Sequence, residues 1–109
     1  MKIEAPRPGR AVRGSKTGRP LMAALDLLGR RGSLRILWEL REGAALTFRE
    51  LAAAAELPPG TLNTRLHELR EAGLVELDEG YRLTKLGAQL PAALAPLVDW
   101  AGSWARSLR

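Results

Sequence analysis

Between residues 57 and 75 the apolar side chains recur at helical spacing. Intervals of four and three residues place three leucines on one face of a helix: Leu62, Leu66 and Leu69. Pro59 suits the first turn, because the backbone N–H that proline lacks would have no partner within the helix. Gly73 can adopt the left-handed conformation that ends many helices. The pattern predicts a helix over residues 59–72.

The outward face of this helix carries short polar groups, where a surface helix usually carries long charged ones. Such groups allow close approach to another polar surface, and Asn, Thr and His can read base edges in the major groove of DNA. The alternative is a solvated helix that happens to be rich in small polar residues. Glu68 is expected at the edge of this face. The short groups are Gly60, Thr61, Asn63, Thr64 and His67.

Two short helices are expected ahead of it. Pro20 begins the first, near residues 21–29, and Ser33 is a good N-cap for the second, which ends at Gly43. The second is apolar almost all round, so it should be the most buried, with Trp38 in the core. The apolar stripe of the first helix is Leu21, Leu25 and Leu28.

A third helix and a tight turn lead into the helix at 59–72. Ala45 and Leu46 can form a short strand. Thr47 and Glu50 then have the spacing of a capping box, which predicts a helix to about Ala55. A helix, a short turn and a second helix with outward polar groups is the helix-turn-helix arrangement.

A small hairpin is expected next. Residues 74–78 alternate apolar and polar, Glu79–Gly80 fits a two-residue turn, and residues 81–83 return. A hairpin directly after a helix-turn-helix is a wing, here over residues 75–83, with Arg82 placed to meet a phosphate. The acidic Glu76, Asp78 and Glu79 argue against a wing tip that enters DNA deeply.

The last helix, which Thr84 should cap, carries a coiled-coil-like seam. Pro91 and Pro96 should each kink or restart it. Trp100 and Trp104 lie near the chain end with little domain left to cover them, so a dimer interface is expected, with folding back onto the first helix as the alternative. The expected interface residues are Leu21, Leu25, Leu90, Leu94, Leu97, Trp100, Trp104 and Leu108.

The net charge of +5 is confined to the leading segment. Residues 1–19 hold six basic residues and one acidic residue, whereas residues 20–109 hold 11 of each. The segment has almost no apolar side chains, so it is expected to be a disordered arm. It would either lie on DNA or act as a solubilising terminus. The side chains expected on phosphates are Arg10, Arg13, Lys16 and Arg19.

Composition excludes several functions. The absence of cysteine excludes disulfides, zinc–thiolate sites and thiol sensing, and a single histidine (His67) makes a histidine-based metal or catalytic site an unfavourable reading. No nucleophile–base pair or phosphate-cradling glycine loop is present, so no enzyme, cofactor or metal is expected. No apolar run could span a bilayer and no signal-peptide pattern is present, so a cytoplasmic protein without membrane contact is expected.

Several stretches in this order resemble the HxlR-type winged-helix transcriptional regulators, which are related to the MarR group. They are ALDLLGRRGSLRILWEL (24–40), LTFRELAA (46–53), PGTLNTRLHELREAGLVE (59–76) and YRLTKLGAQL (81–90), with Trp100 beyond them. The resemblance covers most of residues 20–100.

The resemblance implies a mainly α fold with a small β-hairpin: a winged helix-turn-helix with a three-helix core, a wing and a C-terminal dimerisation helix. The expected division is an arm (1–19), a DNA-binding domain (20–88) and a dimerisation helix (89–109). It also implies a homodimer on a pseudo-palindromic operator in double-stranded DNA. Residues Pro59 to His67 would then enter the major groove, with Asn63, Thr64 and Arg65 nearest to bases and backbone.

Three departures from the family pattern stand out. Gly32 occupies the place of a usual tryptophan, so a cavity for an unidentified small-molecule effector is an open hypothesis; the cysteine often found ahead of the first helix is absent; and the wing is short. Because the body is neutral, a winged helix that binds protein, with only non-specific DNA affinity through its arm, is kept as the alternative function.

Overall fold

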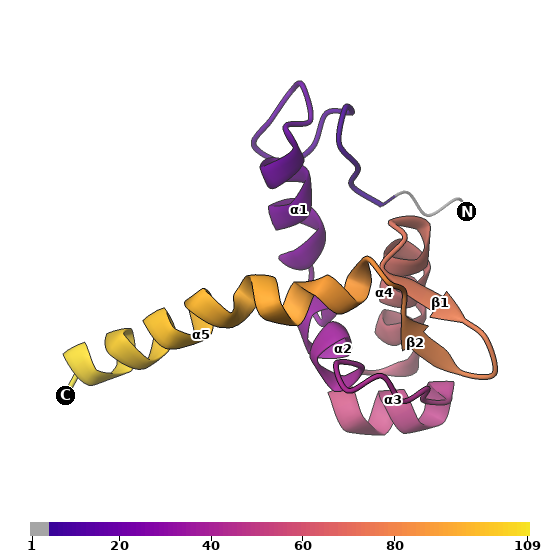
Figure 1. Cartoon of the computed structure of the whole chain (residues 1–109). Coiled ribbons are helices and arrows are strands. Elements are labelled where there is room, and N and C mark those ends of the chain that lie inside the picture. Colours follow the sequence, from indigo (N-terminus) through magenta and orange to yellow (C-terminus); the bar gives the residue numbers. More distant parts are fainter. Residues whose placement is uncertain (1–4) are drawn as a thin grey trace.

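The computed structural model describes residues 5–109 of the chain, and residues 1–4 lie outside the described part. Four helices and a hairpin form the body, from which the last helix projects (Figure 1). In chain order the elements are α1 (Pro20–Leu28), α2 (Ser33–Glu39), α3 (Phe48–Ala55), α4 (Pro59–Glu71), β1 (Val75–Leu77), β2 (Tyr81–Leu83), the 3-10 turn η1 (Gly87–Gln89) and α5 (Leu90–Ser107).

The hydrophobic core lies between α1, α2, α3 and α4. The predicted stripe of α4 is confirmed, because Leu62, Leu66 and Leu69 are all at most 2% exposed. Opposite them, α2 contributes Ile36, Leu37 and Leu40, and α3 contributes Leu51 and Ala55. Burying a leucine or isoleucine contributes roughly 1.5–3 kcal/mol, so this cluster is what fixes α4 on the body.

The wing is a two-stranded antiparallel hairpin, in which Glu76 pairs with Arg82 and Leu77 with Tyr81. The expected two-residue turn is corrected to a three-residue loop, residues 78–80, closed by the Asp78 N–H donating to the Gly80 carbonyl at 2.9 Å. The expected strand at Ala45–Leu46 is a single bridge, with Leu46 exchanging backbone hydrogen bonds with Tyr81 at 2.7 and 2.9 Å.

The capping box at the start of α3 is confirmed. The Glu50 N–H donates to the Thr47 hydroxyl oxygen at 3.1 Å, and the Thr47 N–H donates to the Glu50 carboxylate at 2.9 Å. These hydrogen bonds with the backbone and side chain of Thr47 lower the pKa of Glu50. Gly73, with a φ of 81°, adopts the left-handed conformation predicted after α4.

Two expectations for α2 are wrong. Trp38 is 45% exposed, with the Arg41 guanidinium 3.9 Å from its ring centre, because the buried face of this short helix is the opposite one. Ser33 is the first helical residue and Gly32, at a φ of 88°, is the N-cap. The helix also ends at Glu39, ahead of Gly43.

Residues 5–19 have a defined course, which corrects the expectation of disorder for this part of the leading segment. The Gly9 N–H donates to the Gly18 carbonyl at 2.9 Å, and Val12 and Ser15 exchange backbone hydrogen bonds within the loop. Pro6 is buried against the body. Gly18 needs its positive φ and lack of a side chain, because a Cβ there would lie 2.1 Å from the Arg10 carbonyl oxygen. The expectation for residues 1–4 lies outside the described residues.

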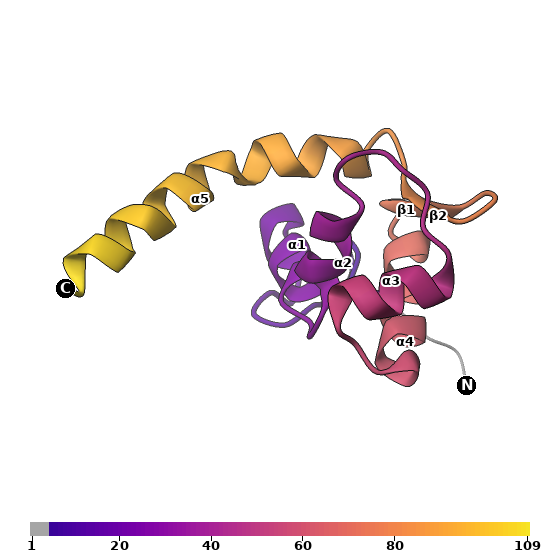
Figure 2. The same ribbon diagram turned by 90° about the horizontal axis from the view of Figure 1, so that it is seen from below.

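Helix α5 leaves the body and has no buried residue (Figures 1 and 2). The breaks expected at its prolines do not occur: Pro91 lies in the first turn, and the helix continues past Pro96 with a gentle curve (Figure 2). Thr84 caps the preceding turn instead of α5, accepting from the Gly87 N–H at 3.0 Å and donating to the Gly73 carbonyl at 2.6 Å. That pair of bonds ties the start of the last helical segment to the end of α4.

Candidate nucleic-acid interface

The outward face of α4 is accessible along its length. The residues expected on this face lie there: Pro59, Gly60, Asn63 and His67 are exposed, and Thr61 and Thr64 are half-buried. The Thr64 hydroxyl donates to the Gly60 carbonyl at 3.1 Å, a bond within the helix that leaves its oxygen free to accept. The face therefore presents donors and acceptors on short side chains, the chemistry that can read base edges.

The turn between α3 and α4 sets the angle of this face. Glu56 ends α3 in the left-handed conformation, with a φ of 54°, and the Leu57 N–H donates to the Ala52 carbonyl at 3.2 Å. Pro59 then begins α4, with Pro58 as its N-cap. A turn of this length between two packed helices is what the helix-turn-helix arrangement requires.

Arg65 lies on the inner side of α4. Its Nη1 donates to the Glu68 carboxylate at 2.5 Å and its Nε to the Arg31 carbonyl at 2.9 Å. Glu68, expected at the edge of the exposed face, is 2% exposed and also bonds Arg30. The guanidinium of Arg65 is thus engaged within the protein, unlike the other α4 residues expected to contact DNA.

Arg82 of the wing is half-buried and opposite Glu76 in the hairpin. Its Nη2 donates to the Asp78 carbonyl at 3.4 Å, a long contact that leaves the other guanidinium nitrogen at its tip accessible to a phosphate. The acidic Asp78 and Glu79 occupy the loop itself and are exposed. The wing can therefore supply one cation beside a negative tip.

The basic side chains of the leading segment remain exposed although their backbone is ordered. They surround the N-terminal end of α1, at the end of the molecule remote from α3 (Figure 1). The structure does not bring them beside the first turns of α4. These residues are Arg10, Arg13, Lys16 and Arg19.

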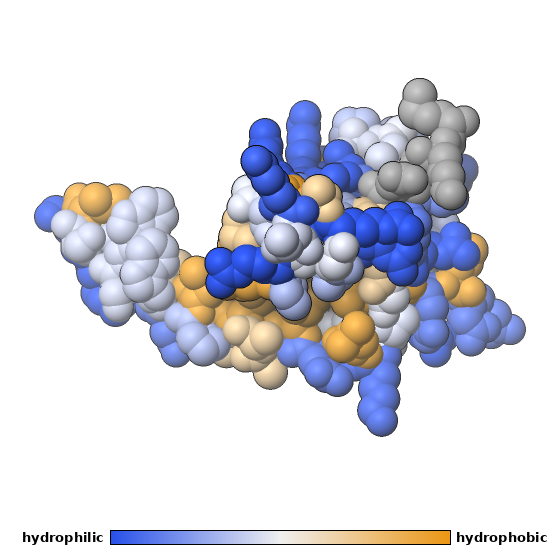
Figure 3. Space-filling view, turned by 90° about the horizontal axis from the view of Figure 1, so that it is seen from above, coloured by the Kyte–Doolittle hydropathy of each residue, from blue (hydrophilic) through white to orange (hydrophobic). Residues whose placement is uncertain are grey.

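The residues expected in a dimer interface are apolar and mostly uncovered. Leu90 packs partly against the core, Leu94 is half-buried, and the other six are each more than half exposed. The rings of Trp100 and Trp104 stack with centroids 5.8 Å apart. Apolar surface continues from α5 onto the adjoining face of the body (Figure 3). The alternative in which α5 folds back on α1 is not what the structure adopts. The exposed six are Leu21, Leu25, Leu97, Trp100, Trp104 and Leu108.

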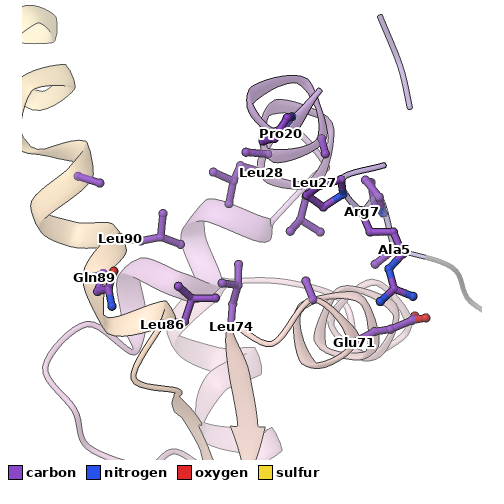
Figure 4. Close-up of a pocket in the computed structure, with 16 residues that line it drawn as sticks. Ala5, Arg7, Pro20, Leu27, Leu28, Glu71, Leu74, Leu86, Gln89 and Leu90 are labelled. Atoms are coloured by element: carbon purple, nitrogen blue, oxygen red, sulfur yellow. The ribbon is translucent and has the colours of Figure 1, made fainter. Parts of the chain in front are cut away.

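Gly32 does not open onto a cavity. A Cβ placed there would lie 2.7 Å from a methyl carbon of Leu57, so Leu57 occupies the space that the family's tryptophan was expected to leave empty. A cavity of about 450 Å³ lies elsewhere, between residues 5–8, α1, the end of α4 and the start of α5. Its wall is mostly apolar, with Leu27, Leu74 and Leu90 facing inward and Arg7 and Glu71 at one end (Figure 4).

Sequence reasoning missed Glu68 and Arg30. The available signal was the position of Glu68 itself, since it lies between Leu66 and Leu69 and so borders the buried stripe of α4. A carboxylate buried there requires cationic partners, because an unpaired buried charge is strongly unfavourable.

Comparison with known proteins gives a consistent class. Residues 33–78 match a family of helix-turn-helix domains. The chain is 35% identical over 99 residues to the uncharacterized HTH-type transcriptional regulator Rv3095 of Mycobacterium tuberculosis (strain H37Rv), covering 84% of this chain and 60% of that protein. It is 28% identical to the uncharacterized HTH-type transcriptional regulator MJ0925 of Methanocaldococcus jannaschii, covering 76% and 83%. The chain thus spans less than two thirds of the length of its mycobacterial relative.

Solved structures agree with this class. Quinone-bound YodB from B. subtilis has a TM-score of 0.73 at 28% identity, covering 77% of this chain and 97% of that one. The MarR family protein Rv2887 of Mycobacterium tuberculosis has a TM-score of 0.63 at 29% identity, covering 80% and 68%. With the helix-turn-helix and the hairpin described above, these likenesses make the chain a winged helix-turn-helix protein, similar to DNA-binding transcriptional regulators.

Two further searches concern other classes of function. Within residues 5–109 there is no helix both long and apolar enough to cross a membrane. In the same range the side chains of His, Asp and Glu form no group of three or more that could hold a metal ion.

Proposed function

We propose that the protein is a sequence-specific transcriptional regulator of the HxlR type that binds double-stranded DNA. Helix α4, over residues 59–72, would enter the major groove, with the wing (75–83) and the basic leading segment on the backbone. One observation carries the proposal: α4 is fixed by three buried leucines while its opposite face presents Asn63, Thr64 and His67 to solvent. The proposed contacts are Pro59, Gly60, Thr61, Asn63, Thr64, His67 and Arg82, with Arg65 acting on the inner side.

We propose that the regulator acts as a homodimer on a pseudo-palindromic operator. Support comes from α5, an 18-residue helix without a buried residue, and from the exposed leucines of α1. Water contact along such a stripe is unfavourable, and a second copy offers the same stripe in return. A two-fold dimer would also space two recognition helices for two half-sites.

The test is fluorescence anisotropy with a duplex from the DNA upstream of the chain's own gene and an unrelated duplex of equal length. A preference of about a thousandfold or more supports a specific regulator, because that is the lower end of typical specificity ratios. Equal, weak binding to both duplexes would contradict the proposal.

The role of the leading segment can be measured separately through salt dependence. Because residues 5–19 are packed, their deletion would disturb the body, so exposed charges are removed instead: Arg10, Arg13, Lys16 and Arg19, each changed to Gln. If half of the eight side chains in a dimer contact phosphates, the slope of log K against log salt becomes less negative by about 3 or more. Arg106→Gln with Arg109→Gln, at the far end of α5, is the matched control, and an equal slope in both variants would rule out phosphate contacts by the segment.

A second function, a winged helix that binds another protein, is favoured by two observations. Residues 20–109 carry no net charge, and the wing loop is acidic. In that case DNA affinity would come only from the leading segment, would lack sequence preference, and would vanish in the four-Gln variant.

We also propose that the cavity beside α1 accepts a small apolar effector. Its volume, about 450 Å³, lies within the range of ligand pockets, and its lining is mostly aliphatic. Narrowing it with Ala24→Leu should abolish any thermal stabilisation that a bound apolar compound gives the parent protein. Stabilisation that persists in Ala24→Leu would place the ligand elsewhere.

A further inference from the structure

A chain of polar contacts runs from the leading segment to α4. The Arg13 N–H donates to one oxygen of Asp26 at 3.3 Å, and the other oxygen of Asp26 lies 3.8 Å from Nε of Arg30. Arg30 then bonds the buried carboxylate of Glu68, whose second oxygen receives Arg65 at 2.5 Å. Three separate parts of the chain thus meet at Glu68: the leading segment through α1, the turn before α2, and α4.

The burial pattern makes Glu68 the centre of this chain. Its side chain is 3% exposed, whereas those of Arg30 and Arg65 are 32% and 19% exposed. Each carboxylate oxygen is taken by a different arginine, so both must be in place to satisfy the charge. Arg65 is further fixed by the Arg31 carbonyl, which leaves the pair little freedom to rearrange.

Resting on the proposed function, we infer that Glu68 is a positioning residue for recognition. It sets the orientation of the reading face of α4 relative to α1, and it lets the leading segment bias that orientation through Asp26 and Arg30. Leucine packing alone allows a helix to slide and rotate by small amounts, whereas two charge-assisted hydrogen bonds fix direction. Because α1 belongs to the proposed dimer face, the same contacts connect the dimer geometry to the reading helix.

The test compares two variants that remove the same charge from the same helix. Glu68→Gln cuts the chain of contacts, and Glu71→Gln, at an exposed position three residues later, leaves it intact. Hydrogen exchange in the full-length protein without DNA should rise about tenfold or more in α4 and also rise in residues 9–19 for Glu68→Gln only. Exchange that is unchanged outside the immediate neighbours of residue 68 would overturn the inference.

DNA binding gives the second readout. In Glu68→Gln the preference for the upstream duplex over the unrelated one should fall by about two- to thirtyfold, while affinity for the unrelated duplex is kept or rises through the lost negative charge. In Glu71→Gln the preference should stay at the parent value. Loss of affinity for both duplexes in proportion to lost thermal stability would show that Glu68 is merely structural.

Two arrangements keep the outcomes separate. If the parent protein shows no preference between duplexes, the proposed function fails, and hydrogen exchange alone decides the coupling. If Glu68→Gln does not fold, Arg30→Gln replaces it, since Glu68 then keeps Arg65 and only the link to α1 is lost. Arg30→Lys should restore the exchange pattern in part, and equal exchange in Arg30→Gln and the parent would overturn the coupling.

Discussion

Helices α4 and α5 are both amphipathic, yet the structure treats them differently. Helix α4 buries three leucines and Glu68 against the body, and every one of these is at most 2% exposed. Helix α5 is longer, carries two tryptophans and buries nothing. The difference shows that an apolar stripe predicts the need for a partner surface, while only the fold decides whether the same chain supplies it.

The largest expected effect comes from breaking the buried side of α4. Leu66→Ala should lower the free energy of unfolding by about 2–5 kcal/mol, because it leaves a cavity where α4 meets the core. Urea unfolding followed by circular dichroism measures this. A loss below about 1 kcal/mol would mean that α4 is not held by the core.

The uncovered side of α5 is tested by Trp100→Ala combined with Trp104→Ala. Buried tryptophans at interface centres contribute about 2 kcal/mol or more, so dimer dissociation should become at least thirtyfold easier by analytical ultracentrifugation. The body should keep its monomeric unfolding behaviour, since neither ring contacts the core. Asp99→Ala, on the opposite side of the helix, is the matched control, and an unchanged dimer in the double variant would remove α5 from the interface.

The reading face of α4 should respond in the opposite manner to its buried face. Asn63→Ala should leave thermal stability nearly unchanged, because the side chain is exposed. It should reduce discrimination between the upstream duplex and a variant with one base pair changed by about 1–3 kcal/mol if Asn63 reads a base. Anisotropy titrations measure this, and uniform weakening against all sequences would assign Asn63 to the backbone.

The smallest effect concerns the cap of α3, which supports α4 from behind. Thr47→Ala should cost about 1 kcal/mol at neutral pH. Since the folded state lowers the pKa of Glu50, the stability that Glu50 contributes is present above its unfolded pKa and is lost as the pH falls through the folded value. Thermal melts between pH 7 and pH 3 should therefore converge for the parent and Glu50→Gln. A difference that grows on acidification would contradict this sign.

Local patterns in the sequence determined most of the fold. The leucine spacing of α4, the capping box at Thr47 and Glu50, the glycine after α4 and the hairpin after it all depend on neighbours within a few residues. Those features were predicted and are present. Their order along the chain also defined the winged helix-turn-helix class, because that class is a succession of local elements.

Contacts between distant residues were decided only by the tertiary structure. Trp38 was predicted in the core and is exposed, since the face a short helix buries depends on which helices surround it. Residues 5–19 gained a course from glycine turns and from packing on the body, which composition alone does not reveal. Glu68 acquired its role from Arg30, 38 residues away, and no periodic pattern records a pairing over that distance.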